Sequence, residues 1–419
     1  MYIDKAMKKL LSVSIILSLL LSFSSCISTE IPEETKEHET LSGEALLSDE
    51  AQDSKSTSEE ASFTQTEEFA ALKKKADEIA SSYSATAVQA AVIKNGKLYF
   101  TYEYGKADID TGKEITSDTK LRIASLSKLV TDIIFMALCD EGLVSLDGDI
   151  GDYLGFPVRN PGFPDKVITP AMLMSHTGSI IDTGAFLESR LSGSSSSIKE
   201  LLSSDAFAYY EPGTYYSYSN FSVALIGSIA ELVTKTPFEE LAKKYVFTPL
   251  GIDAGFTASA VKNQELIANL YGNGGYSVAQ QMALSWHETL GQTHHLVQGN
   301  LTISAKDYMN IAAVLSNGGV SADGTRLLSE KAAQELLKVR YESDSFKSCF
   351  GLLKQSNVIE GTEVCTHTGS NFGMFSAFTI DPVTGNGVAV LTSGAPGTKD
   401  TATDIYSICL EIIRTFYPA

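Results

Sequence analysis

The sequence is poor in cysteine, histidine and tryptophan, and it carries far fewer basic than acidic side chains. It has five cysteines, six histidines and one tryptophan in 419 residues. The four cysteines beyond residue 26 are too few for a disulfide framework, and no Cys/His spacing matches a metal site, so we expect neither a metal nor another cofactor. The net charge of −19 argues against nucleic acid as a partner, because phosphate binding needs a basic surface.

The N-terminus lacks an apolar run long enough to span a bilayer. Three lysines precede the apolar run 10–21, whose twelve residues are too few for a transmembrane helix. A basic start followed by a short apolar run indicates an export signal, here residues 1–25. The following stretch "LSFSSC" resembles a bacterial lipoprotein processing site. This resemblance implies that Cys26 is lipidated and that the protein is anchored on the outer face of the cytoplasmic membrane.

Large apolar side chains are also scarce in residues 26–67. Residues 27–67 contain twelve Asp and Glu but only two Lys, together with many Ser and Thr. Such a segment cannot bury enough surface to fold, so we expect a disordered acidic tether over 26–67. A single domain would then occupy residues 68–419.

The pattern of this domain alternates between helix and strand signals. We expect a helix from about Glu68, a hairpin at Asn95-Gly96, and an apolar helix over 125–141 that stops at Gly142. Residues 146–299 are mostly helix and loop, whereas residues 349–394 contain several strand signals before a last helix. The expected fold is α/β (α+β): a mainly antiparallel sheet of N- and C-terminal strands with flanking helices and an inserted helical lobe.

Two cysteines in the C-terminal strands leave a question open. Cys349 and Cys365 could face each other across a hairpin, but spacing alone cannot decide whether they pair.

Ser125 and Lys128 form the first candidate for chemistry. Three residues apart on a helix, the two side chains share one face, so the amine can reach the hydroxyl. Near a helix start the positive end of the helix favours a developing oxyanion. The same spacing occurs at three other Ser–Lys pairs, but only Ser125 begins a long apolar helix that could bury the lysine. The alternative is that Ser125 merely caps the helix and Lys128 is solvated.

Tyr218 and Asn220 form the second candidate, in "PGTYYSYSNFSVALIG". A phenol beside the Ser–Lys pair could relay a proton, and a carboxamide could hold a substrate amide. Alternatively, Asn220 caps the following helix.

The tetrapeptide HTGS occurs twice, at 176–179 and at 367–370. The second copy follows a short strand, where glycine can bring the backbone close to a ligand. The first copy follows a short helix and should form the loop that ends it, with Gly178 in the left-handed conformation. Local structure therefore favours the second copy as part of a site.

Five segments together resemble one family. "LRIASLSKLV", "ITPAMLMSHTGSI", "PGTYYSYSNFSVALIG", "GNLTISAKDYMNIAAVLSNGG" and "CTHTGSNFG" occur in this order. Over roughly residues 70–415 they are similar to the serine β-lactamase and penicillin-binding-protein superfamily, in its class C-like branch with D,D-peptidases and esterases.

This resemblance implies an acyl-enzyme mechanism and assigns a role to each motif. Ser125 matches the nucleophile, and Lys128 and Tyr218 match the groups that move its proton, without deciding which is the general base. The substrate-binding residues would be Asn220, His367, Thr368 and Gly369, and the backbone amides of Ser125 and Ser370 would form the oxyanion hole. The first HTGS copy matches a loop that supports the helical lobe.

His367 stands where β-lactamases of this branch resemble one another in a lysine. An unperturbed histidine is mostly neutral at pH 7, so its attraction for a substrate carboxylate should be weaker. The resulting hypothesis is a D,D-peptidase or D-amino-acid peptidase at the cell envelope, acting on a peptide of the peptidoglycan type. An esterase is the second hypothesis and a β-lactamase the third. A non-catalytic wall- or ligand-binding relative is the alternative from another class.

Overall fold

The computed structural model describes residues 62–192, 196–272, 274–284, 289–292 and 296–418. The expected signal peptide, nearly all of the expected tether and Cys26 lie outside the described residues, and they stay predictions.

A nine-stranded antiparallel sheet joins the two ends of the domain. Its order is β3-β2-β1-β11-β10-β9-β8-β7-β6, so β1 (Ala87–Lys94) pairs with β11 (Gly387–Ser393). β2 (Lys97–Asp108) follows β1 through Asn95 and Gly96, whose φ angles of 51° and 73° suit a two-residue hairpin turn. Next to β11 lie the expected C-terminal strands β10 (Met374–Ile380), β9 (Thr362–Asn371) and β8 (Leu353–Ile359). The expected fold class is confirmed.

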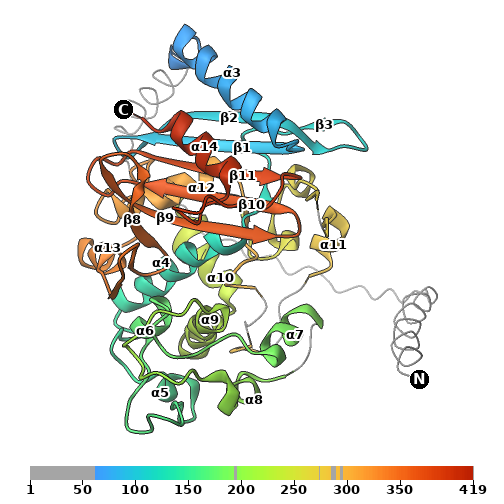
Figure 1. Ribbon diagram of the computed structural model, residues 1–419. Helices are drawn as coiled ribbons and strands as arrows, with labels where there is room; N and C mark the ends of the chain where they lie inside the picture. Colours follow the sequence, from blue (N-terminus) through green and yellow to red (C-terminus); the bar gives the residue numbers. More distant parts are fainter. Residues whose placement is uncertain (1–61, 193–195, 273, 285–288, 293–295, 419) are drawn as a thin grey trace, which may run out of the picture. The chain divides into compact units, whose positions relative to one another are not determined.

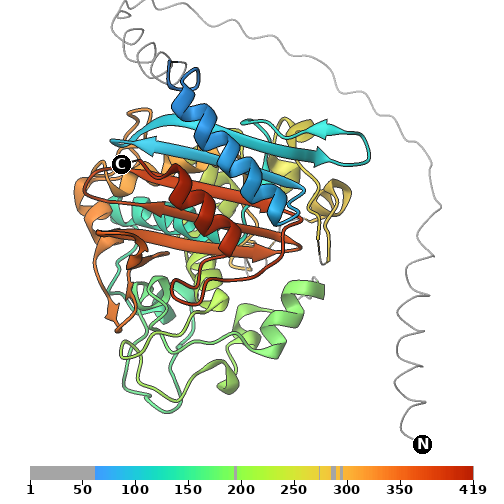
Figure 2. The ribbon, with the colours of Figure 1, turned by 45° about the horizontal axis from the view of Figure 1, so that its top comes forward.

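Helices cover both faces of the sheet. On one face α3 (Glu67–Ser82) and α14 (Ser407–Phe416) pack against the strands, as Figures 1 and 2 show. On the other face lie α4 (Ser127–Asp140) and α12 (Ala305–Ala312). Every residue of β11 and all but the last of β1 are buried, because both faces of the central strands are covered.

The chain between α4 and α12 supplies most of the helices on the side of α4 away from the sheet (Figure 1). They are α5 (Ile150–Leu154), α6 (Pro170–Met174), α7 (Gly184–Ser192), α8 (Ile198–Leu201), α9 (Asn220–Thr234) and α10 (Phe238–Ala242). The same part of the chain forms α11 (Val278–Met282), which Figure 1 shows beside the sheet. The remaining helix and short strands are α13 (Glu330–Leu337), β3 (Lys113–Glu114), β4 (Leu121–Arg122), β5 (Thr302–Ile303), β6 (Tyr341–Glu342) and β7 (Lys347–Ser348).

Within the described ranges no single helix is long and apolar enough to cross a membrane. One bent pair, α9 with residues 238–247, passes that test by length and composition only.

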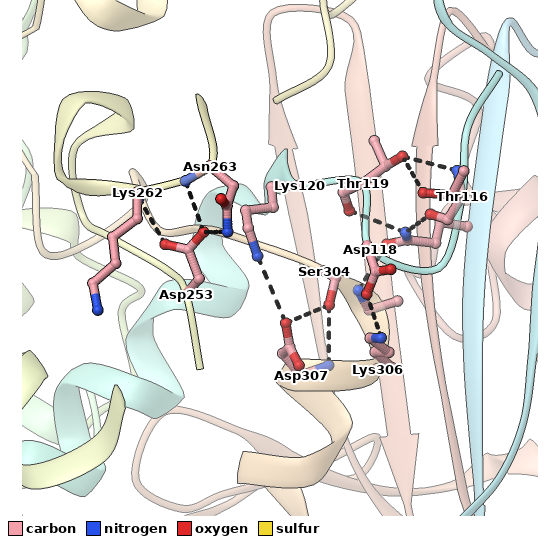
Figure 3. Close-up of polar contacts among 12 residues, drawn as sticks. Thr116, Asp118, Thr119, Lys120, Asp253, Lys262, Asn263, Ser304, Lys306 and Asp307 are labelled. Atoms are coloured by element: carbon pink, nitrogen blue, oxygen red, sulfur yellow. Dashed lines mark hydrogen bonds and ion pairs between the residues drawn. The ribbon is translucent and has the colours of Figure 1, made fainter. Parts of the chain in front are cut away.

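A buried ion pair fixes the segment that leads into β4. The Nζ of Lys120 lies 3.9 Å from Oδ2 of Asp307 on α12 (Figure 3), and the Lys120 side chain is only 5% exposed. Asp307 also accepts a hydrogen bond of 2.7 Å from the Ser304 hydroxyl. Burial raises the pKa of Asp307, and Lys120 opposes that rise. Losing either partner would leave the other uncompensated, so the pair holds β4 against α12.

Two details differ from the sequence-based expectations. The expected helix 125–141 is divided: a 3₁₀ turn covers Ala124–Leu126, and α4 begins only at Ser127. In the first HTGS copy the left-handed residues are His176 and Ser179, with φ angles of 58° and 56°, so the expectation for Gly178 was wrong. Gly178 instead packs tightly, since a Cβ there would come within 3.3 Å of Leu173. Cys349 and Cys365 are both buried and both free.

Candidate active site

Ser125 sits in the tight turn between β4 and α4. Its neighbour Ala124 has a φ angle of 50°, a conformation that side chains rarely adopt. β9 passes directly beside this turn at Gly369, where a Cβ would come within 3.1 Å of the Ser125 nitrogen and 2.7 Å of the Ile123 oxygen. Only glycine allows the strand to approach the serine this closely.

Lys128 lies one turn further along and is completely buried. Its Nζ lies 3.1 Å from the Ser125 Oγ, 2.9 Å from the Asn220 Oδ1 and 2.7 Å from the carbonyl oxygen of Gln298. The Asn220 and Gln298 oxygens can accept a hydrogen bond from Lys128 whether its amine is protonated or neutral. The third, Ser125, can accept from an ammonium or donate to a neutral amine, so the geometry permits proton transfer between the serine and the lysine.

Tyr218 approaches the same serine from the segment before α9. Its hydroxyl donates a hydrogen bond of 2.8 Å to the Ser125 Oγ, and the Lys128 Nζ lies 4.9 Å from the centre of its ring. Because Lys128 and Tyr218 both contact the Ser125 oxygen, the geometry leaves the choice of general base open.

Asp182 organises the residues around Tyr218, although no sequence pattern selects it. One carboxylate oxygen accepts from the Asn220 amide at 2.7 Å, and the other accepts from the Phe221 N–H at 2.9 Å and the Ser219 hydroxyl at 3.2 Å. Asn220 therefore turns its amide nitrogen to Asp182 and its oxygen to Lys128. The helix cap is Ser219, not Asn220.

The first HTGS copy lies behind Tyr218. His176 is buried, its Nδ1 accepts from the Ser219 N–H at 3.3 Å, and its ring centre is 4.6 Å from that of Tyr218. Burial is the main cause that lowers its pKa well below the usual range, and nearby Lys128 adds to it. A neutral imidazole is therefore packed against the phenol, which fits the expected structural role of this copy.

The second HTGS copy forms part of β9. His367 Nδ1 lies 2.6 Å from the Thr368 carbonyl oxygen, which indicates that Nδ1 carries the proton. Desolvation, followed by the charge of Lys128, lowers the pKa of His367 to about 3. The ring is thus neutral throughout the physiological range.

These groups surround one cavity of about 730 Å³, within the range of small-molecule sites. Of the residues predicted from the sequence, Ser125, Tyr218, Asn220, His367, Thr368 and Ser370 line it, whereas Lys128 and Gly369 lie behind its wall. The charged residues in the lining are Arg122, Lys399 and Asp404, and the last two form an ion pair of 2.8 Å. Arg122 is the last residue of the two-residue strand β4, and Lys399 and Asp404 lie between β11 and α14, positions that carried no recognisable sequence signal.

Among the residues described, no group of three or more His, Cys, Asp or Glu is arranged to hold a metal ion.

Known proteins provide an independent comparison. The chain is 27% identical over 297 residues to "Penicillin-binding protein 4" of Amycolatopsis lactamdurans, which covers 69% of this chain and 76% of that protein. It is 29% identical over 190 residues to "D-aminopeptidase" of Brucella anthropi, but spans only 35% of that relative's length.

Solved structures show the same fold. A beta-lactamase/D-alanine carboxypeptidase from Pseudomonas syringae superposes with a TM-score of 0.64 at 19% identity, covering 84% of this chain and 100% of that one. The D-amino acid amidase from Ochrobactrum anthropi gives 0.65 at 19% identity, covering 84% and 98%. The family model described as "Beta-lactamase" matches residues 69–410. The chain therefore belongs to the β-lactamase family, within the serine hydrolase superfamily of β-lactamases and penicillin-binding proteins.

Proposed function

We propose that this protein forms an acyl-enzyme on Ser125 and hydrolyses an amide bond of a D-amino-acid-containing peptide. The observation that carries the proposal is the position of the Ser125 oxygen, 2.8 Å from the Tyr218 hydroxyl and 3.1 Å from the Lys128 amine, at the wall of an open cavity. The names of the relatives, a penicillin-binding protein, a D-aminopeptidase and a D-amino acid amidase, support a peptide or amide substrate.

The reaction would run in two halves. Ser125 Oγ attacks the carbonyl carbon while its proton passes to Lys128 or Tyr218, and the oxyanion is stabilised by the backbone amides of Ser125 and Ser370. The proton then moves to the leaving nitrogen, the C–N bond breaks, and an ester on Ser125 remains. Water attacks this ester and gives one proton to the same relay. The ester C–O bond then breaks, the proton returns to the Ser125 Oγ, and the acyl group leaves as a carboxylic acid.

An ester substrate is the second candidate, and the neutral state of His367 favours it. A neutral imidazole attracts a substrate carboxylate less than the lysine that β-lactamases of this branch have there, so a substrate without that charge loses little. A β-lactam is the third candidate. The non-catalytic alternative is less favoured, because the serine, lysine and tyrosine are all in mutual contact.

Covalent labelling tests the proposal. Full-length protein is treated separately with a fluorescent penicillin and a fluorophosphonate, and the labelled peptide is mapped. We expect Ser125 to be labelled and Ser125→Ala to lose all labelling and turnover. Ser117→Ala is the matched control, because Ser117 has the same spacing to Lys120 in a loop, and it should keep nearly full activity. Absence of labelling by both probes in folded protein would refute the hydrolase.

A substrate panel separates the candidates. Acyl-D-Ala-D-Ala peptides, D-amino acid amides, short-chain esters and cephalosporins are compared by kcat/KM. The peptide proposal predicts the highest kcat/KM for a peptide or D-amino acid amide. A clear preference for esters would replace it with the second candidate.

We also propose that the protein is exported and anchored by a lipid on Cys26, on the outer face of the cytoplasmic membrane. Support comes from the three lysines, the short apolar run and the "LSFSSC" stretch. Replacing Cys26→Ser should move the protein from the membrane to the soluble fraction in cell fractionation. Continued membrane association of this variant would contradict the lipid anchor.

A further inference from the structure

The turn between β9 and β10 carries a bulky residue in a conformation that suits glycine or asparagine. Asn371 pairs with Met374, so Phe372 and Gly373 form a two-residue hairpin turn, with φ angles of 50° and 75°. A turn with positive φ at both positions favours Asn-Gly, and a large side chain at positive φ is strained. Strain of this kind persists only where the surroundings enforce it, and it is concentrated at functional sites.

The Phe372 ring belongs to a cluster of three planar groups. It lies nearly parallel to the ring of Tyr276, with ring centres 4.2 Å apart and an angle of 16° between the planes. The central carbon of the Arg122 guanidinium lies 5.1 Å from the centre of the Phe372 ring and 5.6 Å from that of Tyr276. Arg122 is only 8% exposed, and the attraction between a cation and an aromatic face is stronger where water is excluded. We call Arg122, Tyr276 and Phe372 the guanidinium cluster.

Arg122 also connects this cluster to the segments around the catalytic serine and lysine. Its Nε donates a hydrogen bond of 3.2 Å to the Gly299 carbonyl oxygen. The preceding residue, Gln298, accepts a hydrogen bond from Lys128 through its own carbonyl. Arg122 itself lies three residues before Ser125. The guanidinium cluster therefore contacts both the chain that leads into the serine and the chain that holds the lysine.

The turn is also confined by tight backbone packing. Tyr276 and Leu270 exchange two backbone hydrogen bonds of 2.9 and 3.0 Å, and the N–H of Tyr271 donates to the Ser393 hydroxyl on β11 at 2.8 Å. Gly373 lies so close to this loop that a Cβ there would come within 2.1 Å of the Tyr271 oxygen. Two kinds of contact thus hold the β9–β10 turn, the backbone packing at Gly373 and the ring contacts of the cluster.

The position of this turn matters because Phe372 lies two residues after Ser370. The backbone amide of Ser370 is one donor of the proposed oxyanion hole, and the amide of Ser125, three residues after Arg122, is the other. Two such donors stabilise an oxyanion only if both lie at hydrogen-bond distance from the same oxygen atom. The guanidinium cluster joins the two segments that carry these donors.

We propose that Arg122 and Phe372 are positioning residues that hold the Ser370 amide in place relative to the Ser125 amide, so that both reach the oxyanion. Asn or Gly would suit the turn but would offer Arg122 no ring, which gives the strained phenylalanine a physical purpose. The inference rests on the proposed function, since it assigns both residues a part in that acylation step. They act on the rate of the step and not on binding of the substrate beforehand.

Labelling of Ser125 measures this effect, because the fluorophosphonate adduct places a phosphoryl oxygen where the oxyanion forms. In full-length protein, Phe372→Asn removes the ring but suits the positive φ. We expect its maximal labelling rate to fall at least about tenfold, with little change in Tm or in the concentration that gives half the maximal rate. Phe372→Tyr keeps the ring and should label nearly as fast as wild type. Tyr245→Ala is the control and should keep its rate, since the Tyr245 ring lies 4.3 Å from Lys244 Nζ and does not line the cavity.

Arg122→Lys tests the second positioning residue. Lysine keeps the positive charge but loses the planar group, so labelling should slow by a similar factor. Because both residues act through one cluster, Arg122→Lys/Phe372→Asn should be no slower than the slower single variant. Unchanged rates in the single variants, or independent losses that multiply to about a hundredfold in the double variant, would overturn the proposal.

A second probe distinguishes positioning from direct binding of the substrate by Arg122. The fluorophosphonate is uncharged, whereas fluorescent penicillin carries a carboxylate. Positioning predicts that Arg122→Lys slows labelling by both probes. Slower labelling by penicillin alone, with a higher half-saturating concentration, would mean that Arg122 binds the carboxylate and would overturn the proposal. Wild-type protein that neither probe labels would contradict the proposed hydrolase itself, and the positioning role with it.

Discussion

Asp132 is a buried carboxyl group with no hydrogen-bond partner in the described part of the chain. It lies one helical turn after Lys128 on α4, is fully buried, and neither carboxylate oxygen has a hydrogen-bond partner within the described ranges. Gly351 passes so close that a Cβ there would come within 2.6 Å of its Oδ2. Burial raises the pKa of Asp132 well above its usual value, and Lys128 only partly opposes this.

The raised pKa of Asp132 makes a signed prediction for stability. The folded state holds a proton that the unfolded state releases near pH 4, so the free energy of unfolding falls as pH rises above that value. Asp132→Asn removes this loss and should stabilise the protein at pH 7 by about 1–2 kcal/mol, with little effect at pH 4. Chemical denaturation at both pH values, with the exposed Asp165→Asn as control, measures it. Destabilisation at pH 7 would show that an ionised Asp132 pairs with Lys128.

Individual site residues could be predicted from the sequence only where they belonged to a recognisable spacing or motif. Ser125 and Lys128 stood out because a Ser–Lys spacing coincided with an apolar helix, and the structure places them in contact. Asp182 and Gln298 could not be found this way. Asp182 is a carboxylate in a loop, outside any recognisable motif. Gln298 contacts Lys128 through its backbone carbonyl, which every residue possesses, so its residue type does not reveal the contact.

At the scale of elements, the start of α9 links three parts of the site. Its cap Ser219, its first residue Asn220 and the preceding Tyr218 are fixed together by the carboxylate of Asp182 and the imidazole of His176. The four N-terminal N–H groups of a helix need acceptors, and here Asp182 takes one of them while also orienting Asn220. The position of Tyr218 thus depends on how this helix end is capped.

Replacing Asp182→Ala should therefore affect both stability and rate. We expect a loss of about 1–3 kcal/mol in the free energy of unfolding and a fall in kcat of about tenfold or more, because Tyr218 and Asn220 lose their alignment. Denaturation and steady-state kinetics check this. Asp165→Ala is the control and should change neither quantity. Asp165 is exposed and has no hydrogen bond or ion pair with the described residues. Unchanged kcat in folded Asp182→Ala would remove Asp182 from the positioning of the site.

Helices and strands were predictable where the local sequence pattern was clear. The C-terminal strands are short runs of strand-forming residues bounded by turn signals, and the Asn95-Gly96 turn marks its hairpin, so these were confirmed with small shifts at the ends. The start of α4 was not predictable, because the 3₁₀ turn at 124–126 depends on β9 packing against Ser125 through Gly369, a contact between residues 244 positions apart.

At the scale of the whole domain, the sheet pairs strands from the two ends of the described chain. β1, near the beginning of the described chain, pairs with β11, near its end, over seven residues from Ala87–Ser393 to Ile93–Gly387. These two strands lie inside the sheet, with neighbours on both sides, and α14 covers them on one face. The N-terminal strands therefore cannot complete their core until the last part of the chain is present, which makes folding of the domain depend on contacts distant in sequence.

Two truncations test this dependence. Removing residues 387–419 deletes β11 and α14, exposes both sides of the gap in the sheet and should abolish the cooperative unfolding transition. Removing residues 1–61, which the sequence predicts to be signal and tether, should change Tm by no more than about 2 °C, because every core residue of the described ranges is kept. Circular dichroism melts and limited proteolysis distinguish the two. A cooperative melt of the protein lacking 387–419 would mean that the N-terminal strands and the helices form a stable core alone, and the central β1–β11 pairing would then not be what joins the domain.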